Sequence, residues 1–405
     1  MPKASDVVFV DGVRTPFGRA GEKGVFWKTR SDDLAVHAMR GLLDRNAFDT
    51  AAVDDVAVAA TTQQGDQGLT LGRTVGMLAG LPKSVPGYAI DRMCAGAMTS
   101  VTTLAGAIAF GAADIAIAGG VEHMGRHPMG FNADPNPRFV AERMVSSDAL
   151  VMGATAERLH DRFPAITKDR TDAYAVQSQQ RYAAAWANGK LQPDVIPVEV
   201  NKGDGWDVVS TDEPPRPGTT LEALAALKTP FRPHGRVTAG NAAGLNDGAT
   251  ISLLASEDGA KQHGLSTKMR MVSFAFAGVE PEVMGVGPVP ATDKALSKAG
   301  LSIDDIGLFE INEAFAVQVL AFLDNYGIAQ DSPNVNAWGG AIAVGHPLAS
   351  SGVRLMNQLA AQFAERPDVK YGITTMCIGL GQGGTVIWEN PNHSKSAERS
   401  ARKGA

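Results

Sequence analysis

The chain has 405 residues, of which 44% are hydrophobic and 20% are charged, and its formal net charge is −6. This length is sufficient for two or three domain-sized units around a large buried core. The acidic balance argues against a nucleic-acid-binding protein, because neutralising phosphates needs a basic surface. No apolar run approaches the roughly 20 residues of a membrane helix, and neither end resembles a signal peptide or targeting address. We therefore expect a cytoplasmic protein without membrane or nucleic-acid partners.

The sequence contains two cysteines, Cys94 and Cys377. Two cysteines cannot form a disulfide framework, and no Cys or His residues have the spacing of a zinc site, so no bound metal is expected. A free cysteine in a reducing compartment is more often a small buried core residue than a catalyst. The residues around both cysteines favour catalysis instead.

The N-terminal part predicts alternating strands and helices. A turn is expected at Asp11-Gly12, and a helix is predicted to begin near Ser31 as its N-cap, with Leu34, Ala38 and Leu42 on its buried face. Such alternation favours an α/β fold with a largely buried sheet. Four apolar segments are typical of its strands: residues 7–10, 56–60, 89–90 and 115–118.

The C-terminal part repeats this plan. Val53-Asp54-Asp55-Val56 accompanies a strand in the first half, and Ile303-Asp304-Asp305-Ile306 precedes the predicted strand Leu308–Ile311 in the second. Cys94 and His346 follow these two echoes at nearly the same distance, each in a segment of small residues that opens a helix. The matched spacing indicates an internal duplication.

The middle of the chain, residues 124–247, is rich in proline and methionine and contains one clear helical pattern, Thr171 to Asn188. A segment this long is not a simple connection, so we predict an inserted domain that supplies ligand contacts. The polar residues from Asn390 onwards are expected to fray. The predicted division is residues 1–123 with 248–270 for the first half, 124–247 for the inserted domain, 271–391 for the second half and 392–405 for a flexible tail.

Cys94 lies in Asp91-Arg92-Met93-Cys94-Ala95-Gly96, where a predicted strand ends and a helix rich in alanine and glycine begins. A thiol at a helix N-terminus faces the positive end of the dipole and nearby amides, which should lower its pKa. The same amides can stabilise an oxyanion. We predict that Cys94 is a nucleophile; the alternative is a small core residue at a strand–helix junction.

His346 occurs in Gly345-His346-Pro347-Leu348, with proline placed for the first turn of a helix. An imidazole there could accept a thiol proton near neutral pH, although a lone histidine is more often structural. Its relation to Cys94 in the duplication favours a catalytic base.

Cys377 precedes the stretch from Gly379 to Gly384, which satisfies the GxGxxG pattern of dinucleotide-binding turns. That pattern requires a helix after the glycines, but Thr385–Trp388 predicts a strand. We therefore interpret the glycines as a hairpin whose backbone amides approach a substrate beside Cys377.

Two further groups could contribute. Asn312, after the strand Leu308–Ile311, could orient a water or donate to an oxyanion, or it could simply cap a helix. A basic cluster in the inserted segment could hold nucleotide phosphates or form an ordinary solvated surface. Its members are Arg216, Lys228, Arg232, His234 and Arg236.

Together these segments resemble the thiolase family over nearly the whole chain. The motifs that carry the resemblance occur in family order: the Cys94 helix start, GRVTAGNAAGLNDG at 235–248, NEAFA at 312–316, GGAIAVGHPL at 339–348 and CIGLGQGG at 377–384. The resemblance implies a five-layered αβαβα fold of two pseudo-symmetric βαβαβαββ halves with an inserted loop domain. It also implies a homodimer or homotetramer.

The resemblance assigns roles to these residues. Cys94 would attack the 3-keto carbonyl of a 3-ketoacyl-CoA while His346 accepts its proton, and Cys377 would protonate the departing enolate and then activate coenzyme A. His346 with a water on Asn312 would form one oxyanion hole, and the amides of Cys94 and Gly379 the other. Coenzyme A is implied as a co-substrate, with no permanently bound cofactor. Its expected contacts are Arg216, Phe231, Ala239, Ala243, Met152 and Phe315.

Some positions depart from the family pattern. Asp91 and Ala243 stand where asparagine and serine are frequent, Leu380 resembles degradative members, and Val151 replaces a histidine of acetoacetyl-CoA-specific members. Leu380 and Val151, together with the methionine-rich segment, favour 3-ketoacyl-CoA thiolysis in β-oxidation, with a hydratase–dehydrogenase subunit as a candidate partner. The alternatives are acetoacetyl-CoA synthesis from acetyl-CoA and a thiolase-like lipid carrier without turnover.

Overall fold

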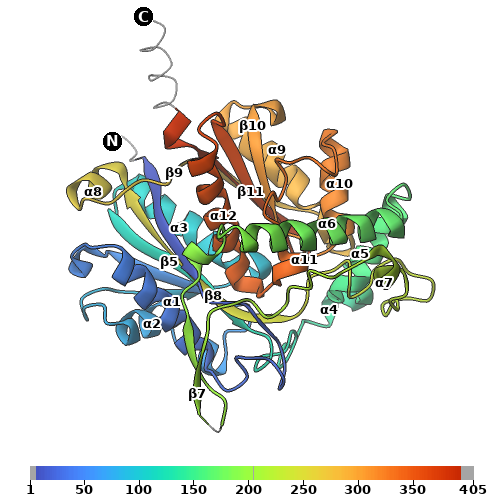
Figure 1. Cartoon of the computed structure of the whole chain (residues 1–405), viewed down its shortest axis with the longest axis horizontal. Coiled ribbons are helices and arrows are strands. Elements are labelled where there is room, and N and C mark those ends of the chain that lie inside the picture. Colours follow the sequence, from blue (N-terminus) through green and yellow to red (C-terminus); the bar gives the residue numbers. More distant parts are fainter. Residues whose placement is uncertain (1–5, 204, 394–405) are drawn as a thin grey trace, which may run out of the picture.

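The computed structural model describes residues 6–203 and 205–393. Within this part of the chain, the central element of the fold is a ten-stranded sheet (Figure 1). The strands lie in the order β10 (Ile306–Ile311), β11 (Tyr371–Ile378), β12 (Gln382–Glu389), β9 (Met269–Gly278), β1 (Val7–Arg14), β8 (Asn246–Ser256), β5 (Ile115–His123), β3 (Asp55–Ala59) and β4 (Tyr88–Ile90), with β2 (Gly18–Arg19) beside β8. Strands β1, β5 and β8 are buried along their whole length, whereas β9 and β4 are mostly only half-buried.

The two halves of the sheet have the same pairing. In the first half β3 is parallel to β5, and β5, β8 and β1 are antiparallel neighbours; β10, β11, β12 and β9 repeat this scheme in the second. The counterpart of the β3–β4 pair is reduced to one parallel bridge between Phe309 and Val335. The halves meet where β1 pairs with β9 at Val8–Arg270 and Phe9–Met269. This repetition confirms the predicted pseudo-symmetry.

Helices on both sides and between the halves complete five layers. α3 (Gly96–Phe110) and α12 (Ser351–Glu365) share the central core with strands of both halves. α1 (Ser31–Arg45) and α2 (Leu71–Ala79) cover the outer face of the first half. α9 (Pro288–Ala299) and α10 (Ala316–Tyr326) cover that of the second. The predicted five-layered α/β fold is confirmed.

The two central helices approach each other through a pair of glycines. A Cβ at Gly352 of α12 would lie 2.6 Å from the backbone nitrogen of Met98 in α3. A Cβ at Gly96 of α3 would lie 2.8 Å from the Cβ of Ala349, just before α12. Side chains at these positions would force the helices apart, so glycine brings the two helix starts together.

Two local predictions in the first half were wrong. The chain does not turn at Asp11-Gly12; β1 continues to Arg14, with an irregularity in its pairing between Phe9 and Asp11. Ser31 is not the N-cap of α1 but its first residue, after Arg30, and its hydroxyl donates to Asp66 at 3.0 Å. A tertiary partner thus replaced the local cap.

The segment between β5 and β8 contains more regular structure than the single helix predicted. The predicted helix is present as α6 (Lys168–Ala187), which crosses the second half in Figure 1. Tyr174 and Ala175 of α6 share a core with strands β10 and β11, so the segment packs on the second half. Its other elements are α4 (Arg138–Ala141), α5 (Met152–Arg162), β6 (Val198–Asn201), β7 (Trp206–Val209) and α7 (Leu221–Ala225).

Short elements complete the chain. The α-helical ones are α8 (Glu257–Gln262) and α11 (Ala341–Val344). The 3₁₀ turns are η1 (Thr50–Ala52), η2 (Gly65–Gln67), η3 (Met93–Ala95), η4 (Ser147–Leu150), η5 (Gln192–Asp194), η6 (Pro281–Val286), η7 (Ile303–Asp305) and η8 (Leu348–Ser350). Two of them, η3 and η8, lie at the starts of the central helices.

Two expectations about exposed or apolar segments need correction. Asn390 does not fray: it is buried, and its Nδ2 donates to the carbonyls of Phe363, Arg366 and Val369. Most of the predicted flexible tail, residues 394–405, lies outside the described residues. One stretch, Met93–Phe110, is long and apolar enough by composition to span a membrane, but 67% of it is buried inside the protein. It is the core helix α3 with the turn before it.

Candidate active site

A cavity of about 850 Å³ opens at the starts of the two central helices. Four of the five residues predicted to be catalytic line it: Cys94, His346, Cys377 and Gly379. They come from three segments that are distant in sequence. Three of the predicted coenzyme A contacts, Met152, Ala243 and Phe315, line the same cavity.

Cys94 is held in the turn η3 immediately before α3. The preceding residue, Met93, has a left-handed backbone with φ of 45°, a conformation that is unfavourable for any residue other than glycine. Asp91 stabilises it by accepting a hydrogen bond from the Met93 amide at 2.6 Å. This strained turn presents the thiol to the cavity, where it is 9% exposed.

The predicted low pKa of Cys94 is contradicted. Burial raises the pKa of the Cys94 thiol to about 11, and hydrogen bonding by the backbone amides of Gly379 and Cys94 only partly offsets this. The carboxylates of Glu122 and Asp91 raise it further. Local helix-start chemistry is therefore outweighed by desolvation, and the resting Cys94 thiol is neutral.

His346 is fixed by hydrogen bonds at its backbone and its ring. Its amide donates to Asn246 Oδ1 at 2.9 Å, and Gly345 before it adopts φ of 100°. The ring Nδ1 lies 2.6 Å from the hydroxyl oxygen of Ser351, the first residue of α12. That hydroxyl also lies 3.1 Å from the carbonyl of Pro347, which can only accept.

These contacts assign the tautomer of His346. Because the Ser351 hydroxyl donates to Pro347, the ring must carry its hydrogen on Nδ1 and donate it to Ser351. Nε2 is then unprotonated, which agrees with the amide Nδ2 of Asn312 lying 3.2 Å from it. Burial, and secondarily the charge of Arg354, lowers the pKa of His346 to about 3. The imidazole is therefore neutral and able to accept a proton.

Asn312 lies behind the imidazole, not in the cavity wall. It continues β10, its amide donates to the carbonyl of Thr375 at 2.9 Å, and its side chain is fully buried. Nδ2 faces the His346 ring, and Oδ1 accepts a hydrogen bond from Arg354. The alternative of a simple helix cap does not hold, because the residue before α10 is Phe315 and it makes no side-chain cap.

Cys377 lies near the end of β11, and the glycines after it form the predicted hairpin with β12. A Cβ at Gly379 would come within 2.7 Å of the Met93 sulfur, so glycine permits close approach of the two loops that flank Cys94. The Cys377 thiol is fully buried; burial and the neighbouring Cys94 raise its pKa. It is thus a protonated thiol, suited to donate a proton.

The walls of the cavity are largely apolar. Methionine dominates, with Met93, Met124, Met129, Met152 and Met284 all lining it. Sequence reasoning missed Met284, which comes from η6 in the second half, and the polar run Thr61–Gln64. The run was detectable, since polar residues directly after a buried strand such as β3 frequently lie at a ligand site.

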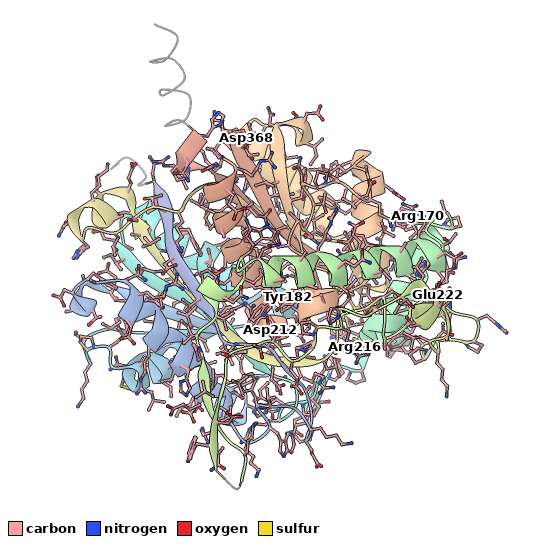
Figure 2. All side chains as sticks on the ribbon, viewed as in Figure 1. Arg170, Tyr182, Asp212, Arg216, Glu222 and Asp368 are labelled. Atoms are coloured by element: carbon pink, nitrogen blue, oxygen red, sulfur yellow. The ribbon has the colours of Figure 1, made fainter. Side chains whose placement is uncertain are left out.

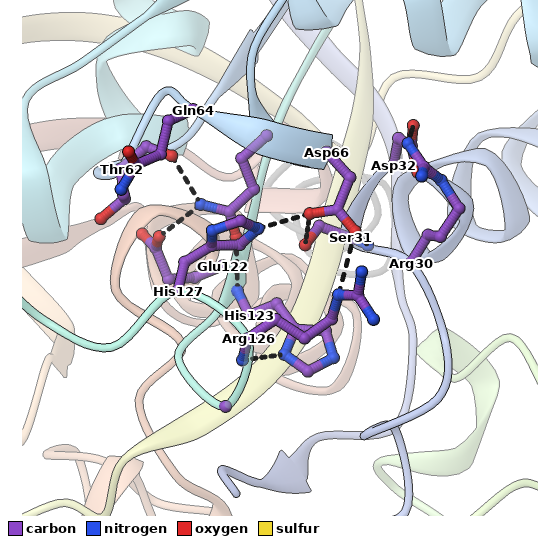
Figure 3. Close-up of polar contacts among 12 residues, drawn as sticks. Arg30, Ser31, Asp32, Thr62, Gln64, Asp66, Glu122, His123, Arg126 and His127 are labelled. Carbon is purple, nitrogen blue, oxygen red and sulfur yellow. Dashed lines mark hydrogen bonds and ion pairs between the residues drawn. The ribbon is translucent and has the colours of Figure 1, made fainter. Parts of the chain in front are cut away.

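A buried polar network supports this wall from behind (Figure 3). Glu122 accepts hydrogen bonds from the amide of Thr61, the side chain of Gln67 and the amide of Ala349, so it links both halves. Nearby, burial tends to raise the pKa of Asp66, but hydrogen bonds from His127 and Ser31 and the charge of Arg126 lower it to about 2. Asp66 is therefore an anion that joins the start of α1 to the cavity wall.

Two family models together match almost the whole chain. A family model described as "Thiolase, N-terminal domain" matches residues 7–258, and one described as "Thiolase, C-terminal domain" matches residues 265–390. The chain belongs to the thiolase family. A 3-ketoacyl-CoA thiolase of Escherichia fergusonii is 43% identical over 387 residues, which cover 95% of this chain and 99% of that protein.

Solved thiolase structures agree with the fold. Human mitochondrial 3-ketoacyl-CoA thiolase is 35% identical, with a TM-score of 0.87 over 95% of this chain and 99% of that one. Its complex with CoA has a TM-score of 0.85, covering 95% of this chain and 98% of that one. An acetyl-CoA acetyltransferase of Bacillus anthracis is 33% identical, with a TM-score of 0.86 over 96% of this chain and all of that one.

The remaining coenzyme A candidates lie outside the lining of the cavity of this thiolase. Arg216, labelled in Figure 2, is bound through its backbone amide to Gln179 at 2.8 Å. Phe231 packs on Gly153, next to the lining residue Met152, and is 41% exposed. Ala239 is exposed nearby. All three are exposed at the protein surface, and Phe231 adjoins the lining through Gly153.

Two residues of the predicted basic cluster, Arg232 and Arg236, form contacts within the protein. Arg232 forms ion pairs with Glu157 and Asp161, and the Arg236 guanidinium donates to the carbonyls of His160 and Ile166. Phosphate binding by these two would break contacts that hold α5. Among the described residues, no group of three or more His, Cys, Asp or Glu side chains is arranged to hold a metal ion.

Proposed function

We propose that this chain is a degradative 3-ketoacyl-CoA thiolase that cleaves its substrate with coenzyme A through an acyl-Cys94 intermediate. The observation that carries the proposal is the convergence of Cys94, His346 and Cys377 on one largely apolar cavity. A neutral base beside a thiol of raised pKa, with backbone amides at the sulfur, matches the needs of thioester chemistry.

The first half-reaction transfers an acyl group to Cys94. Nε2 of His346 takes the thiol proton, and the sulfur attacks the 3-keto carbon. The bond between C2 and C3 then breaks, and the electron pair leaves on C2 as the enolate of acetyl-CoA. Cys377 donates its proton to C2, so acetyl-CoA departs and the shortened acyl group remains on Cys94.

The second half-reaction returns the enzyme to its starting state. The Cys377 thiolate removes the proton of incoming coenzyme A, whose thiolate attacks the acyl thioester. Cys94 leaves and recovers its proton from His346. The amides of Cys94 and Gly379, and His346 once it carries the thiol proton, would stabilise the oxyanions of these steps. Asn312 would act through the imidazole that its Nδ2 contacts. The two stages predict ping-pong kinetics.

The apolar wall favours substrates with extended acyl chains. Methionine side chains are flexible and polarizable, so they adapt to chains of different length. We propose that Met152, Ala243 and Phe315 contact the pantetheine or acyl part, and that Arg216, Phe231 and Ala239 contact the nucleotide part of coenzyme A.

Replacement of the nucleophile tests the proposal. Cys94→Ser should reduce thiolysis of 3-ketoacyl-CoA by several orders of magnitude while CoA-ester binding, measured by calorimetry, persists. Mass spectrometry of the wild type mixed with 3-ketoacyl-CoA should detect the acyl group on Cys94. Thiolysis that survives Cys94→Ser would refute the mechanism, and turnover without any wild-type adduct would do the same.

The similarity to an acetyl-CoA acetyltransferase keeps acetoacetyl-CoA synthesis as a second candidate. The same groups could run the reaction in either direction. Thiolysis rates across 3-ketoacyl-CoA chain lengths separate the two: activity confined to acetoacetyl-CoA would favour the biosynthetic enzyme.

We also propose a cytoplasmic homodimer or homotetramer, with a hydratase–dehydrogenase subunit as a candidate partner. β4 is the terminal strand of the described sheet, its residues are only half-buried, and Leu69 and Phe110 are large exposed apolar side chains. Light scattering of the purified protein would measure the subunit number; a monomer would exclude this assembly.

A further inference from the structure

Arg354 of α12 is a buried cation with no part in the chemistry described above. It is 2% exposed, and its neighbours are amides: Nη1 donates to Gln358, and Nη2 donates to Asn312 Oδ1 at 3.4 Å. Its Nε has no hydrogen-bond partner among the described residues. Burying a guanidinium without a contacting carboxylate is unfavourable, so its retention calls for a reason.

The nearest carboxyl groups do not neutralise it directly. Glu313 accepts hydrogen bonds from Tyr174, Ser178, Asn336 and the amide of Ile342. Glu310 accepts one from Gln362, and burial raises its pKa to about 8 despite the charge of Arg354. Among the described residues, no carboxylate forms an ion pair with Arg354, and Glu310, Glu313 and Asp212 act on its charge only from a distance.

A ligand role does not explain Arg354. It is absent from the lining of the 850 Å³ cavity. It lines a separate internal cavity of about 10 Å³ together with Asp194 and Asn357. That space is at the lower limit for a single water molecule, so it holds no metabolite.

The contact with Asn312 has a directional consequence. A carboxamide can be turned in two ways, and a donor at Oδ1 selects the one with Nδ2 on the opposite side. Here Nδ2 is directed to the imidazole of His346, 3.2 Å from Nε2. We propose that Arg354 is a positioning residue for thiolysis, which fixes the Asn312 amide so that its donor faces the catalytic imidazole. This inference rests on the proposed roles of Asn312 and His346.

The charge of Arg354 has a second effect, on the protonation of the base. After burial, it is the other cause that lowers the pKa of His346, so its removal should raise that pKa. The titratable groups that line the cavity together with His346 are Cys94, Cys377, Asp91 and Asp134. The charged groups that face Arg354 are Glu310, Glu313, Arg14 and Asp212.

The test compares Arg354→Met with Arg354→Lys. Arg354→Met should lower kcat by about 10- to 100-fold, the usual effect of losing a hydrogen bond from a charged group, with little change in KM. The acid limb of its kcat/KM profile should move to higher pH. Arg354→Lys keeps the charge but not the planar donor, so the acid limb should return to the wild-type position while kcat stays reduced.

If Arg354 only stabilised the fold, kcat and the acid limb of the kcat/KM profile would not change together. Asn357→Ala, three residues along α12, removes a buried amide without hydrogen-bond partners and should leave kcat and the acid limb unchanged. Wild-type kcat in either arginine variant, or a fall in kcat for Arg354→Met without movement of the acid limb, would overturn the inference. If Arg354→Met does not fold, kcat of Arg354→Lys decides.

The same assay separates this inference from the proposed function. His346→Ala and Cys94→Ser report on the catalytic site itself. If they are inactive while Arg354→Met and Arg354→Lys behave as the wild type, only the role of Arg354 is wrong. If they remain active, the proposed site is wrong.

Discussion

The starts of α3 and α12 occupy equivalent places in the two halves of the fold, yet they offer different chemistry. Cys94 precedes α3, whose buried polar side chains are small hydroxyls such as Ser100, which donates to backbone carbonyls. His346 precedes α12, which buries Ser351, Arg354 and three amide side chains in the same central layer. One helix thus packs almost entirely as a core element, and the other carries a polar network.

The difference follows from what each reactive group needs. A cysteine sulfur in the α3 turn can be served by backbone amides, which any sequence provides. An imidazole has two distinct nitrogens, so its tautomer and orientation must be set by side chains. In α12, Ser351 contacts His346 and Arg354 contacts Asn312, so this helix supplies side chains that orient the imidazole. We expect substitutions near His346 to alter protonation, and substitutions near Cys94 to alter it less.

The largest effect is expected from His346→Ala. Without the base, Cys94 must ionise unaided, and general bases typically contribute about 10²- to 10⁴-fold. Because the folded-state pKa of the Cys94 thiol is raised to about 11, the thiolate is scarce at neutral pH and grows as pH rises towards that value. The activity of His346→Ala should therefore recover partly as pH is raised. Steady-state thiolysis from neutral to alkaline pH measures this.

The pH profile of His346→Ala tests the contrast between the starts of α3 and α12. A profile of His346→Ala that is flat with pH would mean that the thiolate already exists in the resting enzyme. The α3 turn would then activate its thiol by itself, and the contrast between the two helix starts would disappear.

The sequence predicts the reactive groups better than their environments. Cys94, His346 and Cys377 stand in short segments rich in small residues, so local patterns and the family resemblance bring out three residues that line one cavity. The pKa of Cys94 was predicted in the wrong direction, because the dipole argument uses residues next to it while desolvation depends on the whole cavity. Arg354 was missed for a similar reason: an arginine within a helix normally indicates a solvated surface.

Local structure was also overruled by distant contacts. Ser31 looks like a helix cap, yet Asp66 takes its hydroxyl. Asn390 looks like the start of a loose tail, yet it is held by three carbonyls, one in the last turn of α12 and two in the α12–β11 connection. The polar run Thr61–Gln64 becomes a cavity wall only because Gln67 and Glu122 hold it beside Ala349. Apart from Gln67, these partners are distant in sequence.

A smaller effect is expected from Ser351→Ala. Removing the hydroxyl leaves Nδ1 of His346 without its acceptor, so the ring loses the contact that sets its tautomer. We expect kcat to fall by about 10-fold, the lower end of losses for groups that orient a reactive side chain. Ser350→Ala is the matched control, since Ser350 also donates to Pro347 but does not contact the ring. Equal rates in the two variants would contradict the tautomer assignment.

The smallest effect on catalysis should come from the helix crossing, where stability is the measured quantity. A Cβ at Gly352 would lie 2.6 Å from a backbone atom of α3, so Gly352→Ala should lower the free energy of unfolding by about 1 to 3 kcal/mol through overpacking. Gly106→Ala, on the exposed side of α3, meets no atom within 4 Å and should raise it by about 0.5 to 1 kcal/mol because alanine favours helix. Urea unfolding of both variants measures the difference. If Gly352→Ala were as stable as Gly106→Ala, the two helices could move apart at little energetic cost. Their close contact would then not be what brings Cys94 and His346 to one cavity.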